Sequence, residues 1–239
     1  MHSRKAIRLI HTSDVHLGDG SGHPYAMLAL KAVVDAAPRL GGHMLLLAGD
    51  IFDNARVSDD MIQDFLYELA RLDMPAVVLP GNHDLYGEGS VYRRDVFHGK
   101  PDNLQVIEGT DGQTISYPDL ALDIWGRAML SHTPEFRPLR GMPARREDRW
   151  LVALAHGHFH HEGDVDQRSS PIYAADVADA TCDYLALGHW DRHDDVSQGS
   201  VTAVYSGTAR GPASSNYLGE VTVVDLDPVD GVSYRQVPL

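Results

Sequence analysis

Residues 44–53 read MLLLAGDIFD, so that five apolar residues, Met44 to Ala48, run directly into Gly49 and Asp50. A run this short with a glycine at its exit is typical of a strand buried in a parallel sheet. Four further apolar runs end as abruptly, at residues 7–10, 76–79, 150–155 and 184–187. The repeated pattern predicts a sheet whose strands lead into polar loops.

Amphipathic helices are expected between the early strands. Residues 25–37 have a helical pattern that ends before Pro38. Ser58 is a good N-cap for a second helix, because Asp59 and Asp60 follow in the first turn. The apolar positions of that helix fall on one face: Ile62, Phe65, Leu66 and Leu69. Alternation of strands and helices predicts an α/β fold with a largely parallel sheet.

The pattern becomes rich in short strands from Leu104 onward. Strands are expected at residues 104–107, 114–117, 121–125, 201–206, 220–227 and 232–237. We expect them to form a second, mostly antiparallel sheet that packs on the first, with helices outside. Residues 127–149, which hold three prolines and several arginines, are predicted to be a surface loop. The expected architecture is α/β, a two-sheet β-sandwich flanked by helices, in a single domain of residues 1–239.

The composition excludes several classes of protein. The chain has 239 residues, with 20 Lys plus Arg, 34 Asp plus Glu, 14 His and one Cys, and its formal net charge is −14. A single cysteine cannot form an internal disulfide, and thiolate zinc sites are excluded for the same reason. The negative charge argues against broad, non-specific binding to nucleic acid or anionic membranes. The abundance of histidine makes the positions of those residues the next question.

Neither a secretory signal nor a membrane span is expected. Arg8 and His11 interrupt the apolar run near the N-terminus. No stretch reaches the roughly 18 to 20 apolar residues that cross a bilayer. We therefore expect a cytoplasmic protein without a membrane partner, while the sequence gives no indication of its oligomeric state.

Side chains with oxygen or nitrogen donors follow the predicted strands. Ligands of open α/β sheets bind beyond the carboxyl ends of the strands, so residues at these exits should converge. The convergent set is Asp14, His16, Asp50, Asn82, His156, His189 and Asp191. A set of oxygen and nitrogen donors without a thiolate fits ions such as Mn, Fe or Zn better than it fits ions that prefer soft thiolate ligands. Seven ligands exceed the needs of one ion, so they indicate two divalent ions that share a bridging carboxylate.

The same residues resemble a known family. The motifs are Asp14-x-His16, Gly49-Asp50-x-x-Asp53, Gly81-Asn82-His83-Asp84, a histidine after a strand, and Gly188-His189. Together and in this order they resemble the calcineurin-like metallophosphoesterases, over about residues 7–209. Within that superfamily, residues 11–18 (HTSDVHLG) and 183–189 (DYLALGH) are most similar to the SbcD-type DNA repair nucleases. The resemblance implies a four-layer αββα fold.

The resemblance also implies a role for each residue. One ion would be held by Asp14, His16 and Asp191. The other would be held by Asn82, His156 and His189, with Asp50 as the bridge. A metal-bound hydroxide would attack phosphorus in line. His83 would stabilise the transition state or protonate the leaving oxygen, and Asp84 would orient its ring.

Asp191 departs from the family pattern. Relatives usually place a second histidine two residues after the one that matches His189, and this chain has Asp191 there. A carboxylate is still a competent ligand, and because it is harder than imidazole it favours Mn or Fe over Zn. His193 is the alternative ligand if the loop bends differently.

Each of these residues also has an ordinary structural explanation. Asp14 and Asp50 are suited to capping turns, and Asn82 after Gly81 is a common turn pair. Their joint position at the strand exits favours a metal site over these separate explanations.

Three functions are weighed on this basis. The favoured one is a dinuclear metal-dependent phosphoesterase, with a phosphodiester preferred as substrate. The alternative is an SbcD-like DNA exo- or endonuclease. The net charge disfavours it, and so does our expectation that a chain ending at Leu239 lacks the further C-terminal regions of those nucleases. A non-catalytic interaction module is disfavoured by the intact ligand set and by His83.

Overall fold

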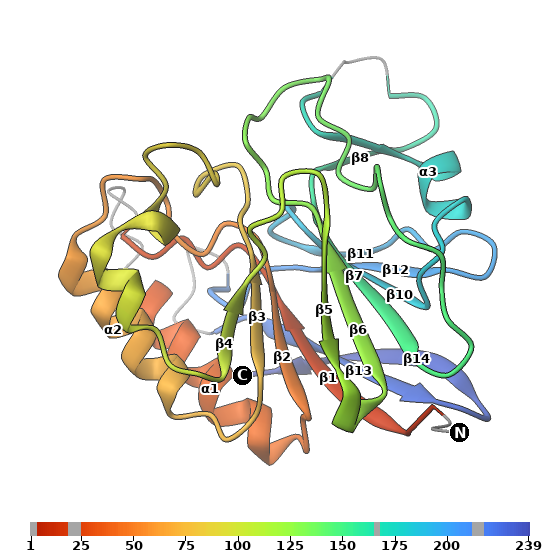
Figure 1. The fold of residues 1–239 in the computed structure, drawn as a ribbon, viewed down its shortest axis with the longest axis horizontal. Helices are drawn as coiled ribbons and strands as arrows, with labels where there is room; N and C mark the ends of the chain where they lie inside the picture. Colours follow the sequence, from red (N-terminus) through yellow and green to blue (C-terminus); the bar gives the residue numbers. More distant parts are fainter. Residues whose placement is uncertain (1–3, 19–24, 165–167, 212–217) are drawn as a thin grey trace.

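Two sheets lying face to face form the centre of the molecule (Figure 1). The computed structural model describes residues 4–18, 25–164, 168–211 and 218–239. Within them, each of the two large sheets has six strands, and helices cover the outer side of the first sheet. The predicted α/β sandwich is confirmed.

The first sheet has a parallel core and an antiparallel edge. Its strands lie in the order β14 (Gly231–Pro238), β13 (Glu220–Asp227), β1 (Ile7–Thr12), β2 (Met44–Ala48), β3 (Ala76–Leu79) and β4 (Leu104–Val106). Strands β1 to β4 pair in parallel, while β13 and β14 pair antiparallel. Assigning β4, β13 and β14 to the second sheet was therefore wrong, because β4 continues the parallel series and β13 returns beside β1.

The second sheet is also mainly parallel, contrary to the prediction. Its order is β11 (His193–Asp195), β12 (Thr202–Ser206), β10 (Tyr184–Gly188), β7 (Trp150–His156), β6 (Leu122–Gly126) and β5 (Gln113–Tyr117). The four central strands pair in parallel, and only β5 and β11 at the edges are antiparallel. Long connections separate the central strands along the chain, and such connections allow the crossover that parallel pairing requires.

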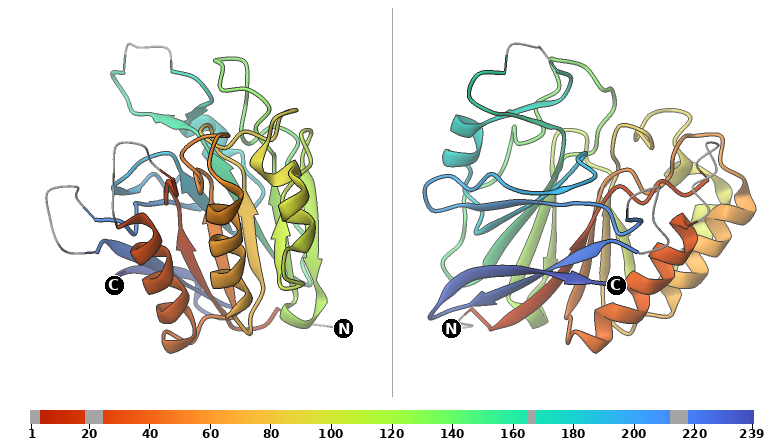
Figure 2. Two further views of the ribbon diagram at one scale, coloured as in Figure 1. Left: turned by 90° about the vertical axis from the view of Figure 1, so that its left-hand side faces the viewer. Right: turned by 180° about the vertical axis from the view of Figure 1, so that it is seen from behind.

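Two amphipathic helices cover the outer face of the first sheet (Figure 2). They are α1 (Ala26–Arg39) and α2 (Asp59–Ala70). The predicted cap is confirmed, because the Ser58 side chain accepts a hydrogen bond from the Met61 backbone N–H. Helix α1 runs past the predicted stop, with Pro38 in its last turn. In the described part of the chain, three short 3-10 helices lie in the connections: η1 (Val91–Arg93), η2 (Asp95–Gly99) and η3 (Pro118–Leu120).

The outer face of the second sheet has a thinner cover. It consists of α3 (Ala174–Ala178) and a small parallel pair, β8 (His158–His160) with β9 (Pro171–Tyr173). Phe159, Ile172 and Val177 from these elements pack on Leu185 and other residues of the sheet. The inner faces of the two sheets meet through a separate apolar cluster that includes Leu46, Val77, Val152 and Ala186. Burial on both faces explains why the central strands are continuously apolar.

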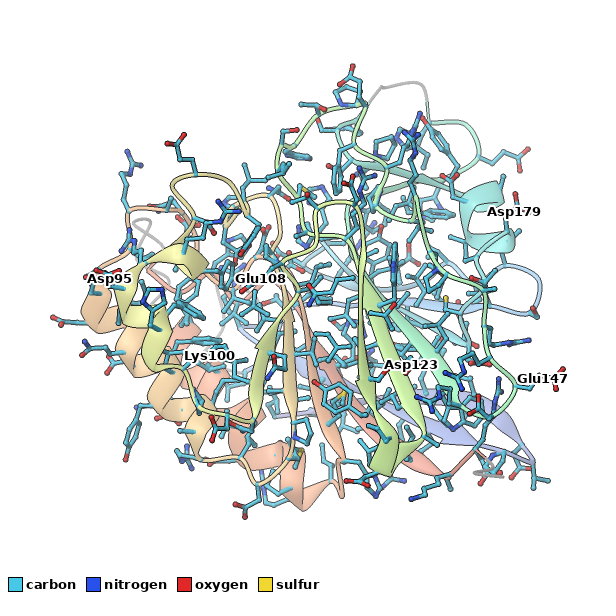
Figure 3. The ribbon with its side chains drawn as sticks, in the orientation of Figure 1. Asp95, Lys100, Glu108, Asp123, Glu147 and Asp179 are labelled. Atoms are coloured by element: carbon cyan, nitrogen blue, oxygen red, sulfur yellow. The ribbon has the colours of Figure 1, made fainter. Side chains whose placement is uncertain are left out.

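Many acidic side chains lie far from the sheet exits. Asp95, Glu147 and Asp179 are exposed at the periphery (Figure 3). The net charge of the chain therefore arises partly from its outer surface. Among the described residues, no helix is long and apolar enough to cross a membrane.

Candidate functional site

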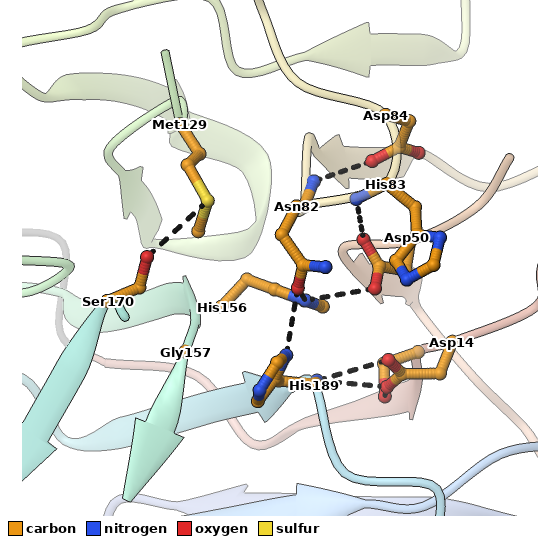
Figure 4. A network of polar contacts seen from close by, with 12 residues as sticks. Asp14, Asp50, Asn82, His83, Asp84, Met129, His156, Gly157, Ser170 and His189 are labelled. Carbon is orange, nitrogen blue, oxygen red and sulfur yellow. Dashed lines mark hydrogen bonds and ion pairs between the residues drawn. The ribbon is translucent and has the colours of Figure 1, made fainter. Parts of the chain in front are cut away.

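The polar residues that follow the parallel strands meet in one cavity of about 300 Å³. Because β1, β2 and β3 are parallel, their carboxyl ends share one edge of the first sheet, and the exits of β7 and β10 face them from the second sheet. Figure 4 shows the resulting network of side chains. The cavity is lined by Asp14, His16, Asp50, Asp53, Asn82, His83, His189, Asp191 and Arg210, and His156 lies buried behind it.

The backbone is strained at four of these positions. The φ angles of Asp14, His16, Asp50 and His189 are 55°, 52°, 54° and 108°, in the region that favours glycine. Such conformations cost about 1–3 kcal/mol each and persist only where the surroundings impose them. Here the loops after β1 and β2 brace each other, because the backbone N–H of Asp14 donates to the Gly49 carbonyl at 3.0 Å and that of His16 donates to the Asp50 carbonyl at 3.0 Å. The strain is concentrated where side chains are aimed into the cavity.

One group of donors is built around the His156 imidazole. Its Nδ1 lies 2.9 Å from the Ala48 carbonyl oxygen, so this nitrogen carries the proton of a neutral ring. The other nitrogen, Nε2, lies 2.9 Å from Asn82 Oδ1 and 3.2 Å from Asp50 Oδ2. His189 Nδ1 approaches the same Asn82 oxygen at 2.8 Å. A lone pair that faces two oxygen acceptors needs a cation among them, so this group fits a metal ion.

A proton is the alternative occupant of that lone pair. Burial lowers the pKa of His156, but the charge and hydrogen bond of Asp50 outweigh it and raise the pKa to about 9. Burial and the charge of His156 lower the pKa of His189 to about 3, so that its lone pair is available near neutral pH. Protons and metal ions therefore compete for the first imidazole, as is usual for metal sites.

The second group contains Asp14, His16 and Asp191, whose ligand atoms all lie within 4.8 Å of one another. Asp14 is buried and accepts the backbone N–H of His189 at 3.0 Å. Burial raises the pKa of its carboxyl to about 6. A buried carboxylate so close to a second one, Asp50, is costly unless a cation compensates their charge. This group therefore also fits a metal ion.

Asp50 lies between the two groups. Its Oδ2 is 3.2 Å from His156 Nε2 and 3.9 Å from His16 Nε2. Its Oδ1 accepts the backbone N–H of His83 at 2.8 Å, which fixes the orientation of the carboxylate. The geometry is that of a carboxylate able to contact two ions at once.

Asp53, rather than Asp84, contacts the His83 ring. His83 Nδ1 lies 2.8 Å from the Asp53 carbonyl oxygen, and the Asp53 carboxylate is 3.3 Å from His16 Nδ1. Asp84 instead accepts bonds from the backbone N–H groups of Gly81 and Ile51. These contacts give no support to the prediction that Asp84 orients the imidazole, because its buried carboxylate bonds to backbone groups of two loops.

Asp191 lies at the mouth of the cavity and is 69% exposed. Its Oδ1 is 3.1 Å from Arg210 Nη2, so the carboxylate has a cationic partner in addition to its position near Asp14. His193 is part of strand β11, and its ring contacts the Tyr205 carbonyl and Gln236. The geometry therefore favours Asp191 over His193 as a ligand.

Two residues that contribute to the site or support it were not predicted from the sequence. The His132 ring lies 5.6 Å from that of His189, and it comes from the segment that was expected to be only a surface loop. Tyr92 donates its hydroxyl to Asp84 at 2.6 Å in the buried interior. Neither residue falls in a motif or at a strand exit, so no local signal marked it.

Gly188 allows the exits of the two sheets to meet. A Cβ atom at this position would lie 1.9 Å from the Ala48 carbonyl oxygen and 2.8 Å from Ser13 Cβ. Gly188→Ala is therefore expected to force the sheets apart and to lower the free energy of unfolding by at least about 1–3 kcal/mol, as measured by urea denaturation. Gly89→Ala, where a Cβ meets nothing within 4 Å, is the control and should change stability by less than about 0.5 kcal/mol. Equal stabilities of the two variants would contradict the close approach.

Known proteins resemble this chain in both sequence and structure. Over an alignment of 274 positions, the chain is 24% identical to the D component of nuclease SbcCD from Bacillus subtilis (strain 168), covering 98% of this chain and 70% of that protein. An archaeal phosphodiesterase superposes with a TM-score of 0.51 at 14% identity, over 98% of this chain and all of the other. A dimetal phosphatase from Danio rerio superposes with a TM-score of 0.55 at 12% identity, over 97% and 98% of the two chains. At these identities the solved structures show a shared fold.

A match to a family model shows the family of this chain. The model for calcineurin-like phosphoesterases matches residues 7–192, which is more than half of the chain. The matched segment contains both groups of metal-ligand candidates and His83. The chain therefore belongs to the calcineurin-like phosphoesterase family and is a hydrolase of phosphoric esters.

Proposed function

We propose that the site binds two divalent cations and hydrolyses phosphodiesters. The observation that carries this proposal is the position of Asp50, whose carboxylate lies between the His156 group and the His16 group. In the proposal, Asp14, His16 and Asp191 would hold one ion. Asn82, His156 and His189 would hold the other, and Asp50 would be shared between them. Carboxylate, amide and imidazole donors support Mn or Fe, with Zn as the alternative.

The charges in the cavity favour a diester over a monoester. Among the described residues, four carboxylates line it, those of Asp14, Asp50, Asp53 and Asp191. Two divalent cations would neutralise them, and Arg210 would then leave one positive charge. That balance matches the single negative charge of a phosphodiester better than the two charges of an ionised monoester. The archaeal phosphodiesterase with the same fold is consistent with this preference.

The chain's own residues contribute positioning and proton transfer. Two bound divalent ions activate water as a nucleophile and neutralise charge on the phosphoryl group. His83 is 43% exposed at the cavity, and its Nδ1–H is engaged by the Asp53 carbonyl. In the imidazolium form, its Nε2–H is therefore the group that can stabilise or protonate the leaving oxygen. Asp53 holds that ring in place, and Asp84 holds the loop that carries it.

A substrate panel with defined metals tests the proposed function. The protein is stripped of metal, supplied with Mn²⁺, and assayed on bis-(p-nitrophenyl) phosphate and p-nitrophenyl phosphate. Metal-dependent turnover with a higher kcat/KM for the diester is expected. Absence of turnover after supplementation with Mn²⁺ would overturn the proposal, and a clear preference for the monoester would overturn its diester part.

DNA cleavage is the second candidate function. The likeness to the Bacillus subtilis nuclease component over 98% of this chain favours it. The net charge of −14 opposes it, although a local basic groove can bind nucleic acid on an acidic protein. Salt-sensitive cleavage of DNA ends, without turnover of small diesters, would support this function over the first.

Arg210 is proposed to bind the phosphate group. It is the cationic side chain among the residues that line the cavity, and Thr208 Oγ1, 3.2 Å from its Nε, helps to hold it. Arg210→Ala is expected to raise KM for the diester about tenfold, because a charge-assisted hydrogen bond to the substrate is lost. Steady-state kinetics measure this effect, with Arg56→Ala at an exposed position as the control. An unchanged KM would remove Arg210 from substrate binding.

A further inference from the structure

A second cavity of about 440 Å³ lies beside the candidate metal centre. The segment that follows β10 contributes alternate residues to the two cavities. His189 and Asp191 line the first cavity, whereas Trp190 and Arg192 line the second. His158, which also lines the second cavity, has its ring 6.0 Å from that of His189. One ligand can therefore reach both cavities.

The second cavity contains a fixed aromatic surface. The Trp190 ring stacks on Tyr205, with centroids 5.0 Å apart and an interplanar angle of 18°. Its Nε1–H donates to His158 Nδ1 at 3.3 Å, and the His161 ring lies 5.4 Å away. Trp190 nevertheless remains partly exposed. An aromatic side chain held in this way loses little conformational freedom when a flat group packs beside it.

The charge of this cavity differs from that of the metal centre. Among the described residues that line it, Arg168 and Arg192 accompany one carboxylate, that of Asp164. The Arg192 guanidinium lies 5.9 Å from the Trp190 ring centroid. Aromatic rings beside guanidinium groups are the combination that binds flat, electron-rich groups with negative charge nearby, as in the stacking of nucleobases.

We propose that this second cavity is a subsite for a planar aromatic group, such as a nucleobase, that is attached to the phosphate held in the first cavity. The inference rests on the proposed function and extends it, because it names the class of ester: a nucleotide unit rather than an aliphatic phosphodiester. The nucleotide unit can come from a small dinucleotide or from the end of a nucleic acid strand. The two sources share the same contacts, and the experiment compares them.

Binding measurements in the intact protein test the subsite directly. The dissociation constants of adenosine 5′-phosphate and inorganic phosphate are measured by isothermal titration calorimetry, with and without Mn²⁺. We expect the nucleotide to bind at least tenfold more tightly than phosphate, and Arg192→Met to remove about fivefold or more of that advantage. Arg56→Met, at an exposed position that lines neither cavity, is the matched control. Equal affinities for nucleotide and phosphate would overturn the inference.

Fluorescence locates the bound group. Of the three tryptophans, Trp125 and Trp150 are 1% and 2% exposed, so that a nucleotide that stacks in this cavity should alter mainly the Trp190 emission. The nucleotide should change the emission and phosphate should not, and Trp190→Phe should abolish the change. A response that persists in Trp190→Phe would place the nucleotide elsewhere and overturn the inference.

Failure of the subsite is distinguishable from failure of the proposed function. Turnover of bis-(p-nitrophenyl) phosphate without any nucleotide preference would overturn the subsite and leave the phosphodiesterase intact. Nucleotide binding without turnover of any diester would support the subsite and overturn the catalytic proposal. A dinucleotide and a single-stranded oligonucleotide are then compared in the same titration. Tighter binding of the oligonucleotide would identify a strand end as the source, and equal binding a small dinucleotide, with the subsite supported in both cases.

Discussion

Asp50→Asn is expected to lower bound metal and to reduce diester turnover by at least about 100-fold. The change keeps the size of the side chain and an oxygen that can accept the His83 backbone N–H, so the local fold should survive. It removes the negative charge that lies between His156 and His16. Changes at residues that merely support a metal ligand already cost 10–100-fold in affinity or activity, so the loss of a shared ligand should cost more. Elemental analysis after dialysis and steady-state kinetics measure the two effects.

A matched control separates this effect from a general loss of acidity. Asp95→Asn removes an equal charge from a fully exposed position and should leave both metal content and turnover unchanged. Circular dichroism should show that both variants are folded. If Asp50→Asn retained full metal content and full turnover, Asp50 would not be a shared ligand.

His83→Ala is expected to retain metal and to lose about 10²- to 10⁴-fold in kcat, which is the usual contribution of a general acid or base. The imidazole is exposed at the cavity and is held through Nδ1 by the Asp53 carbonyl, which leaves Nε2 for the substrate. His83 also lies close enough to His16 and Asp50 to be a ligand itself. Measuring metal content alongside kcat therefore distinguishes the two roles.

The control for this variant is His98→Ala, which changes a histidine that is 77% exposed and does not line the cavity. Its metal content and its kcat should equal those of the unmodified protein. Loss of metal in His83→Ala would make His83 a ligand, and unchanged kcat would remove it from the mechanism.

The strand exits were predictable because their signal is local. An apolar run that stops at a glycine or a polar residue marks the end of a buried strand, and parallel strands bring such ends to one edge. This reasoning placed Asp14, Asp50 and Asn82 in one cavity with His189, as the structure shows. Their assignment as metal ligands remains a prediction that the experiments above must test.

The pairing within the second sheet was not predictable in the same way. Whether β6, β7 and β10 pair in parallel depends on how the intervening segments cross the sheet, and no crossover helix was predicted in those segments. The direction in which side chains point within tight loops also could not be predicted from the sequence. Asp84 is adjacent to His83 in sequence, yet its carboxylate bonds to backbone groups of the neighbouring loop. Sequence adjacency does not fix direction where the backbone turns sharply.

The contact between Asp191 and Arg210 also could not be predicted from the sequence. The two residues are 19 positions apart, and strands β11 and β12 separate them. The sequence identified the departure from the family's usual histidine, and the structure shows that a cation accompanies the carboxylate. The pair compensates the negative charge that the substitution adds at the mouth of the cavity.

Anomalous diffraction from a crystal soaked in Mn²⁺ tests the central claim most directly. We expect two peaks in the cavity, one beside Asp14 and His16 and one beside Asn82 and His156, with the Asp50 carboxylate between them. Paired ions of this kind lie about 3.5–4 Å apart. A cavity without peaks, or a single peak that Asp50 does not contact, would contradict the dinuclear site.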